Sequence, residues 1–105
     1  MITINIAQDY TKTPGGRFKS EGKYSGEDFR QKILLPKYIE AKSKSESLKV
    51  ILDGGYGYAT SFLEEAFGGL ARDRKEREIL NIIIISDEEP ALIQKIRKYI
   101  EDALE

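Results

Sequence analysis

The stretch LKVILDGGYGYATS, residues 48–61, decides the fold class of this chain. Its first six residues, 48–53, are short, β-branched and nearly all apolar, which is typical of a strand covered on both faces in a parallel sheet. A second run of this kind, LNIIII, occupies residues 80–85, and residues 61–71 between the two runs have helical periodicity. Such a strand–helix–strand unit needs a right-handed crossover and favours a sheet with helices packed against it.

The N-terminal segment predicts a hairpin. Ile2, Ile4 and Ile6 alternate with polar side chains in residues 1–9, which indicates a half-buried strand. The sequence TPGG that follows is a strong turn signal, because proline fixes φ and glycine accepts a positive φ. We expect the short polar segment 17–24 to form the second strand of this hairpin.

Two more helices flank the central unit. Ser25 begins the first, since its hydroxyl can accept a hydrogen bond from the backbone N–H of Asp28. Pro36 interrupts this helix, and we expect a kink there because proline lacks the N–H and clashes with the preceding turn. The last helix spans residues 87–104, with Pro90 in its first turn.

The predicted order of elements is therefore β-β-α-β-α-β-α. A chain of 105 residues has room for one compact domain, and we find neither an internal repeat nor a linker. The fold class is α/β, with a single domain over residues 1–105, a mixed sheet of about four strands, and helices packed against it.

Composition excludes several classes of function. Lys and Arg number 17 against 18 Asp and Glu, so a nucleic-acid binder that relies on a strong positive field is not expected. The chain has no Cys and no His, which excludes disulfides, thiolate metal sites, Cys nucleophiles and an imidazole base. We expect no cofactor and no metal. No apolar stretch approaches the ~20 residues of a membrane span, and no signal peptide is visible, so we expect a cytoplasmic protein without membrane contact.

The loop 53–61 is the candidate site. It joins the carboxyl end of a strand to the start of a helix, where ligands bind in open α/β sheets. The spacing Gly55-x-Gly57-x-x-Thr60 is similar to a dinucleotide fingerprint but lacks the third glycine, and the lysine of a P-loop is missing. The simpler interpretation of the glycines is that they allow a tight turn and a close approach of two chain segments. The candidate partner- or ligand-binding residues are Asp53, Gly54, Gly55, Tyr56, Gly57, Tyr58 and Glu64.

Thr60 and Ser61 have two interpretations. Ser61 followed by Glu64 fits a capping box, in which each residue satisfies a backbone N–H of the other. Alternatively, the hydroxyls at an exposed helix start accept a phosphoryl group. The helix dipole would favour that group by ~0.3–1 kcal/mol, while Glu64, Glu65 and Asp53 would repel it. Since the two effects nearly cancel, such a modification would act mainly on a docked partner.

Two further features predict close contacts. The glycine pair at 68–69 costs roughly 1 kcal/mol per residue in a helix, which close packing of the helix backbone on the sheet or on a partner would explain. Packing on the sheet is the favoured interpretation. Arg17 and Arg30 could face a bound anion, although ion pairs with Glu21 or Glu27 are the simpler interpretation.

The sequence VILDGGYGYATSFLEEAFGGLAR, residues 50–72, resembles the STAS-like domain family of unknown function. TPGGRF and SGEDFRQKILLPKY are similar to the N-terminal half of the same family. The resemblance implies the strand–loop–helix layout of STAS domains, which are named for sulphate transporters and anti-sigma factor antagonists. In the antagonists, a partner kinase phosphorylates a Ser at the start of the corresponding helix. Ser61 matches this Ser by position, and Thr60 matches the residue before it.

The chain departs from the antagonists at this place. They usually have Asp-Ser-Ser-Gly, whereas residues 59–62 read Ala-Thr-Ser-Phe, so the acidic residue is missing and a bulky Phe62 replaces a glycine. The resemblance also implies a partner class, namely a histidine-kinase-type ATPase or an anti-sigma-like protein.

We therefore hypothesise a non-catalytic regulatory or signalling domain that binds a protein partner through the loop 54–61 and the helix after it. Phosphorylation of Ser61 or Thr60 is the candidate switch. The alternative is a nucleotide- or small-anion-sensing domain that uses the same Gly-rich loop. An enzyme ranks third, because a Ser nucleophile would need Lys or a carboxylate as its base and no such arrangement is visible. Homo-oligomer formation stays open.

Overall fold

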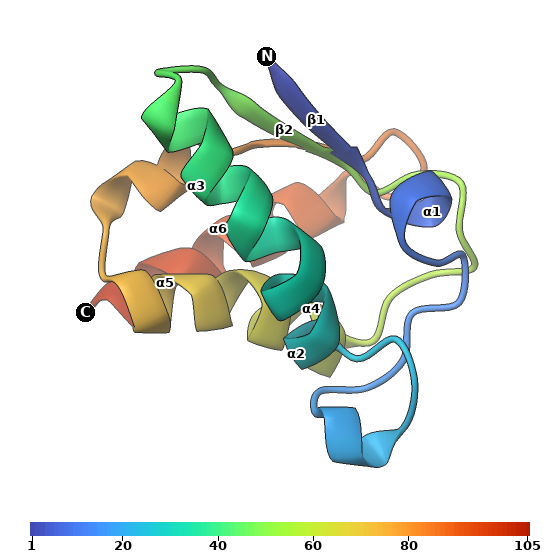
Figure 1. Cartoon of the computed structure of the whole chain (residues 1–105). Coiled ribbons are helices and arrows are strands. Elements are labelled where there is room, and N and C mark those ends of the chain that lie inside the picture. The colour runs from blue at the N-terminus through green and yellow to red at the C-terminus, as the bar shows by residue number, and fades with distance from the viewer.

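Three short parallel strands form the sheet, in the order β1-β2-β3. The computed structural model describes residues 1–105 (Figure 1). The strands are β1 (Ile2–Asn5), β2 (Leu48–Ile51) and β3 (Ile83–Ile85). Ile4 pairs with Val50, and Val50 pairs with Ile84. The mixed α/β architecture is confirmed, but the sheet has three strands, all parallel, rather than about four in a mixed arrangement.

The predicted N-terminal hairpin is wrong. The first strand ends early, because α1 (Ile6–Asp9) begins where the Asn5 side chain accepts a hydrogen bond from the Gln8 N–H at 3.2 Å. Residues 17–24 form no strand; they make an irregular loop with a short turn, η1 (Lys19–Glu21). This polar segment has no apolar face to bury against a sheet, so β1 pairs with β2 instead.

Only one face of the sheet is covered by helices. Ile4, Val50 and Ile84 are buried on that face, whereas Ile83, one position along, is 37% exposed. In Figure 1 the helices α3 (Leu35–Ser43), α5 (Gly69–Arg74) and α6 (Ala91–Leu104) all lie below the strands. The prediction that both faces are covered is therefore wrong. A run of isoleucines is compatible both with a strand that has one solvent-exposed face and with a strand that is covered on both faces.

The first long helix runs without a break through α2 (Gly26–Phe29), η2 (Arg30–Leu34) and α3 (Leu35–Ser43). Its predicted cap is confirmed: Ser25 Oγ accepts a hydrogen bond from the Asp28 N–H at 3.0 Å. The distortion expected at Pro36 takes the form of a wide π turn, η2, just before the proline. Such a turn accommodates both the missing N–H and the bulk of the ring without ending the helix.

The second long helix also contains a π turn. It consists of α4 (Thr60–Leu63), η3 (Glu64–Gly68) and α5 (Gly69–Arg74), so it is longer than the predicted span 61–71. The chain then makes a 3₁₀ turn, η4 (Arg77–Asn81), which shortens the strand predicted over 80–85.

The last helix, α6 (Ala91–Leu104), begins directly after Pro90 rather than at residue 87. Its residues Leu92, Ile96 and Ile100 are buried in the core. Phe29 and Phe62 stack at 5.8 Å between ring centroids and so join the two long helices. No helix combines the length and the apolar character that crossing a membrane requires.

Candidate functional site

The loop between β2 and α4 is fixed at its backbone. The Gly54 N–H donates to Glu88 Oε1 at 2.8 Å, and the Tyr56 N–H donates to the Lys12 carbonyl at 2.9 Å. These bonds connect the loop to the segment before α6 on one side and to the N-terminal segment on the other. The loop is therefore a rigid support for the side chains that it carries.

Asp53 has a structural role at the start of this loop. Its carboxylate accepts hydrogen bonds from the N–H groups of Asp87 at 3.0 Å and Glu88 at 2.9 Å. It thus joins the carboxyl ends of β2 and β3. Because both oxygens are used in this way, the carboxylate is committed to the fold rather than free for a ligand.

The glycines of the loop are explained by the chain path. Gly54 and Gly57 have φ values of +97° and +114°, which side chains rarely allow. A Cβ at Gly55 would lie 3.0 Å from the Lys12 carbonyl oxygen, so this residue permits close approach of the two segments. Of the two interpretations left open by the sequence, a turn with a close chain contact accounts for all three glycines.

The two tyrosines of the loop have different environments. Tyr58 is half-buried, its ring lies 5.7 Å from that of Phe62, and its hydroxyl donates to the Leu52 carbonyl at 2.8 Å. Burial, helped by the negative charge of Asp53, raises the pKa of Tyr58 to about 12. Tyr56, by contrast, is 85% exposed. Tyr58 anchors the loop, and Tyr56 is presented to solvent.

Thr60 and Ser61 lie at the open start of the second long helix. Thr60 is exposed, Ser61 is half-buried, and neither hydroxyl has a hydrogen-bond partner within the protein. The capping-box prediction for Ser61 is wrong, because the N-cap is Ala59, two residues before Ser61, and the helix begins at Thr60. Ser61 therefore sits inside the first turn, where its side chain caps nothing.

Glu64 belongs to a cluster of charges between the two long helices. Its carboxylate pairs with Arg17 and with Arg72, each at 2.5 Å. Glu65 pairs with Arg30 at 2.6 Å and with Arg17 at 3.2 Å. Ion pairs of Arg17 and Arg30 with Glu21 or Glu27 were the simpler prediction, and this prediction is wrong. The true partners lie far along the chain, where no local pattern indicates them.

The same cluster explains the glycine pair in the helix. A Cβ on Gly69 would collide with the Arg30 guanidinium, and one on Gly68 would come too close to the Glu64 carboxylate. The pair therefore makes room for the ionic cluster, and the prediction that it packs on the sheet is wrong.

A cavity of about 230 Å³ opens beside the loop at the carboxyl ends of β2 and β3. Asp53, Glu88 and Glu89 line it, together with Tyr56 and Tyr58, and no Lys or Arg does. It is smaller than the roughly 300–1,000 Å³ of common ligand pockets, and its carboxylates would repel a phosphate. The cavity therefore lacks the positive charge that an anion site needs.

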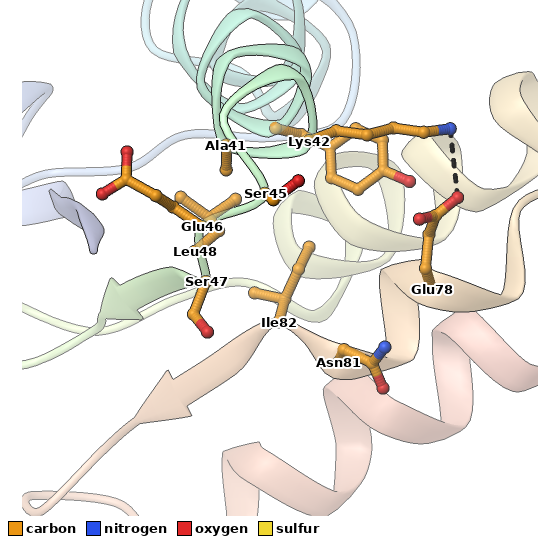
Figure 2. A pocket seen from close by; sticks show the side chains of 10 residues that line it. Ala41, Lys42, Ser45, Glu46, Ser47, Leu48, Glu78, Asn81 and Ile82 are labelled. Carbon is orange, nitrogen blue, oxygen red and sulfur yellow. Dashed lines mark ion pairs between the residues drawn. The ribbon is translucent and has the colours of Figure 1, made fainter.

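A second cavity, of about 220 Å³, lies at the opposite end of the sheet, between α3, the start of β2 and η4. Figure 2 shows its cation, Lys42, extending toward Glu78, at 3.0 Å. Lys42 also forms an ion pair with Glu76, at 2.5 Å. The Glu76 carboxylate in turn accepts a hydrogen bond from the Tyr38 hydroxyl at 2.8 Å. These groups satisfy one another, so the cavity has no free charge with which to hold an ion. No local sequence pattern indicates this network, since Glu76 and Glu78 lie more than 30 residues from Tyr38 and Lys42.

The comparison with known families agrees with the geometry. The model of the STAS-like domain of unknown function matches residues 25–92, which include both long helices, β2, β3 and the candidate loop. No curated protein matches the chain, and no solved structure does. The chain belongs to the family of STAS-like domains of unknown function.

Proposed function

We propose that this domain is a non-catalytic regulatory module that binds a protein partner through the loop 54–61 and the start of α4. The exposure of Tyr56 carries the proposal: 85% of this large aromatic residue faces solvent on a loop that its own backbone bonds hold in place. Tyrosines of this kind are enriched at the centres of protein interfaces, because they offer apolar area and a hydroxyl at little entropic cost.

Phosphorylation of Thr60 or Ser61 is the switch that we propose for this surface. A kinase would transfer the terminal phosphoryl group of ATP to the hydroxyl oxygen, with release of ADP and a proton. The added charge of about −1.5 to −2 would stand at the start of α4, within the proposed docking surface, and alter docking directly. The exposed Thr60 is the more accessible of the two hydroxyls.

The surroundings of these hydroxyls support the switch better than the sequence suggested. Glu64 is paired with two arginines and Glu65 with Arg30, so their charges are largely compensated. Asp53 is held by two backbone N–H groups. Repulsion of a phosphoryl group is thereby reduced, while the fold does not depend on either hydroxyl. The proposed partner, by analogy with STAS domains, is a histidine-kinase-type ATPase or an anti-sigma-like protein.

The proposal is tested by affinity capture from cells of the source organism with quantitative mass spectrometry. Three baits are compared: wild type, Tyr56→Ser, and the control Ile39→Ser, which removes a side chain 43% exposed on α3. We expect that Tyr56→Ser lowers the recovery of one partner by about tenfold or more, as the loss of a hot-spot residue does. Ile39→Ser should leave the recovery of this partner unchanged. Equal recovery with all three baits would contradict docking at this loop.

The switch has its own test. Ser61→Asp and Thr60→Asp should alter recovery of the same partner, while the thermal melting temperature stays within about 2 °C of wild type, since the substituted side chains have no partner in the fold. Phosphosite mapping of the native protein should find phosphate on Thr60 or Ser61 in at least one growth condition. Unmodified residues in every condition would remove the switch but leave the docking surface.

A further inference from the structure

The loop that replaces the expected hairpin forms a depression of its own. It has a volume of about 410 Å³, within the usual range of ligand sites. Its lining residues are Lys19, Gly22, Lys23, Tyr24, Asp28 and Lys32. None of them belongs to the loop 54–61, so this site is separate from the proposed docking surface.

The depression carries uncompensated positive charge. Of its three lysines, Lys32 is paired with Asp28 at 3.1 Å. Asp28 also accepts a hydrogen bond from the Tyr10 hydroxyl at 2.5 Å, so its charge is already committed. Lys19 and Lys23 form no ion pair. Two free ammonium groups match the charge of a phosphate monoester, about −1.5 to −2, better than that of a single carboxylate.

Tyr24 is held in a conformation that tyrosine rarely adopts. Its φ is +61°, in the left-handed region that is strained for a bulky side chain. The Tyr10 ring meets it edge-on, at 5.4 Å between centroids and 87° between planes, and Tyr10 in turn packs on Phe29 at 5.3 Å. The backbone N–H of Lys19 donates a hydrogen bond to the Glu27 carboxylate at 2.9 Å. The surroundings thus fix a strained loop that keeps the Tyr24 residue 41% exposed beside the lysines.

We propose that this depression binds a phosphate monoester that also contains a flat unsaturated ring. The ammonium groups of Lys19 and Lys23 contact the phosphate, since lysine serves as a point charge for phosphate oxygens. The ring of the ligand stacks on Tyr24, as bases do on exposed aromatic side chains. This chemistry has two sources, a free nucleotide and a phosphorylated tyrosine of another protein.

Isothermal titration calorimetry with phenyl phosphate tests the site, and methyl phosphate serves as the matched probe without a ring. Phenyl phosphate should bind at least about fivefold more tightly than methyl phosphate, because this ratio corresponds to the weakest stacking interactions of a ring on an aromatic side chain. Tyr24→Asn should abolish this difference and keep the fold, because asparagine tolerates a positive φ. Lys23→Gln and Lys19→Gln should each weaken phenyl phosphate about tenfold, as loss of a charged hydrogen bond does.

Lys95→Gln is the control, since Lys95 is exposed on α6 outside the depression, and it should leave the affinity unchanged. Amide shifts on titration should concentrate in residues 19–32. Comparing the affinities of adenosine 5′-monophosphate and a phosphotyrosine peptide distinguishes the two sources. The ligand that binds more tightly identifies the source. The proposal is overturned by absence of saturable binding at millimolar phenyl phosphate, by equal affinity for the two probes, by indifference to Lys23→Gln, or by shifts confined to residues 54–61.

Discussion

Arg30 and Glu65 form an ion pair in the interior, with Nη1 2.6 Å from Glu65 Oε2 and each residue only 8% exposed. The same Nη1 also donates to the Glu65 backbone carbonyl at 2.6 Å. The pair joins the π turns of the two long helices, and Gly69 leaves the space that the guanidinium fills. The cluster holds together the helix that presents Thr60 and Ser61 and the loop that carries Arg17.

Arg30→Ala should therefore lower the free energy of unfolding by about 3 kcal/mol, the lower end of the cost of breaking a buried ion pair. The buried Glu65 carboxylate then loses its nearest partner and keeps only the longer contacts with Arg17 at 3.2 Å and Arg72 at 3.6 Å. Urea denaturation measures this loss. Arg77→Ala, an exposed arginine without an ion pair, should change stability by less than about 0.5 kcal/mol. Similar effects of the two substitutions would mean that the interior ion pair is not formed.

The two serines at helix starts should differ in their contribution to stability. Ser25→Ala removes an N-cap and should cost about 1 kcal/mol. Ser61→Ala removes a hydroxyl without a partner and should cost less than about 0.5 kcal/mol. Thermal unfolding of both variants compares them directly. If Ser61→Ala lowered the free energy of unfolding as much as Ser25→Ala, the side chain of Ser61 would cap the helix as the sequence predicted.

The open face of the sheet predicts a contrast between neighbouring isoleucines. Ile84, 8% exposed, faces the helices, and Ile84→Ala should cost about 2–5 kcal/mol through the cavity it leaves. Ile83, 37% exposed, points to the other face, and Ile83→Ala should cost less than about 1 kcal/mol. Chemical denaturation distinguishes these values. Comparable losses would show that both faces are covered.

Acid should destabilise the fold in a defined range of pH. The Lys42 ammonium, followed by the Tyr38 hydroxyl, holds the pKa of Glu76 at about 2, below its usual 4.5. The hydrogen bond from Arg72 likewise lowers the pKa of Glu64. Because these pKa values are lower in the folded state, the stability they contribute is complete above about pH 4.5 and is lost as the pH falls toward 2.

Urea unfolding at several pH values between 4.5 and 2 tests this linkage. Glu76→Gln should show a shallower decrease of stability than wild type, since it has no carboxyl to protonate at that position. Glu101→Gln, which removes an exposed carboxyl without an ion pair, should keep the slope of wild type. Identical slopes for all three proteins would exclude the contribution of Glu76.

Local signals predicted much of the fold. The cap between Ser25 and Asp28 and the distortion before Pro36 each follow from the chemistry of one or two residues, and both are present. The positions of the parallel strands follow from apolar runs, although their ends shifted. The glycine loop, its exit from β2 and its entry into a helix start also follow from the sequence.

What the sequence did not predict depends on contacts between distant residues. Arg17 lies 47 positions from Glu64, and their ion pair holds one end of the segment that was expected to be a strand. Gly69 is explained only when Arg30 is placed beside it. A Ser followed three residues later by Glu indicates a capping box, but Glu64 was already engaged by arginines. Which face of an isoleucine-rich strand is covered depends on where the helices pack, which periodicity does not encode.

Photo-crosslinking in living cells tests the central claim, that Tyr56 presents the surface to which a protein docks. A benzoylphenylalanine replaces Tyr56 in one strain and Ile39, an exposed residue of α3, in another. Upon irradiation, we expect a discrete adduct with one protein at position 56 and none with that protein at position 39. The same adducts from both positions, or none from position 56 in any growth condition, would contradict it.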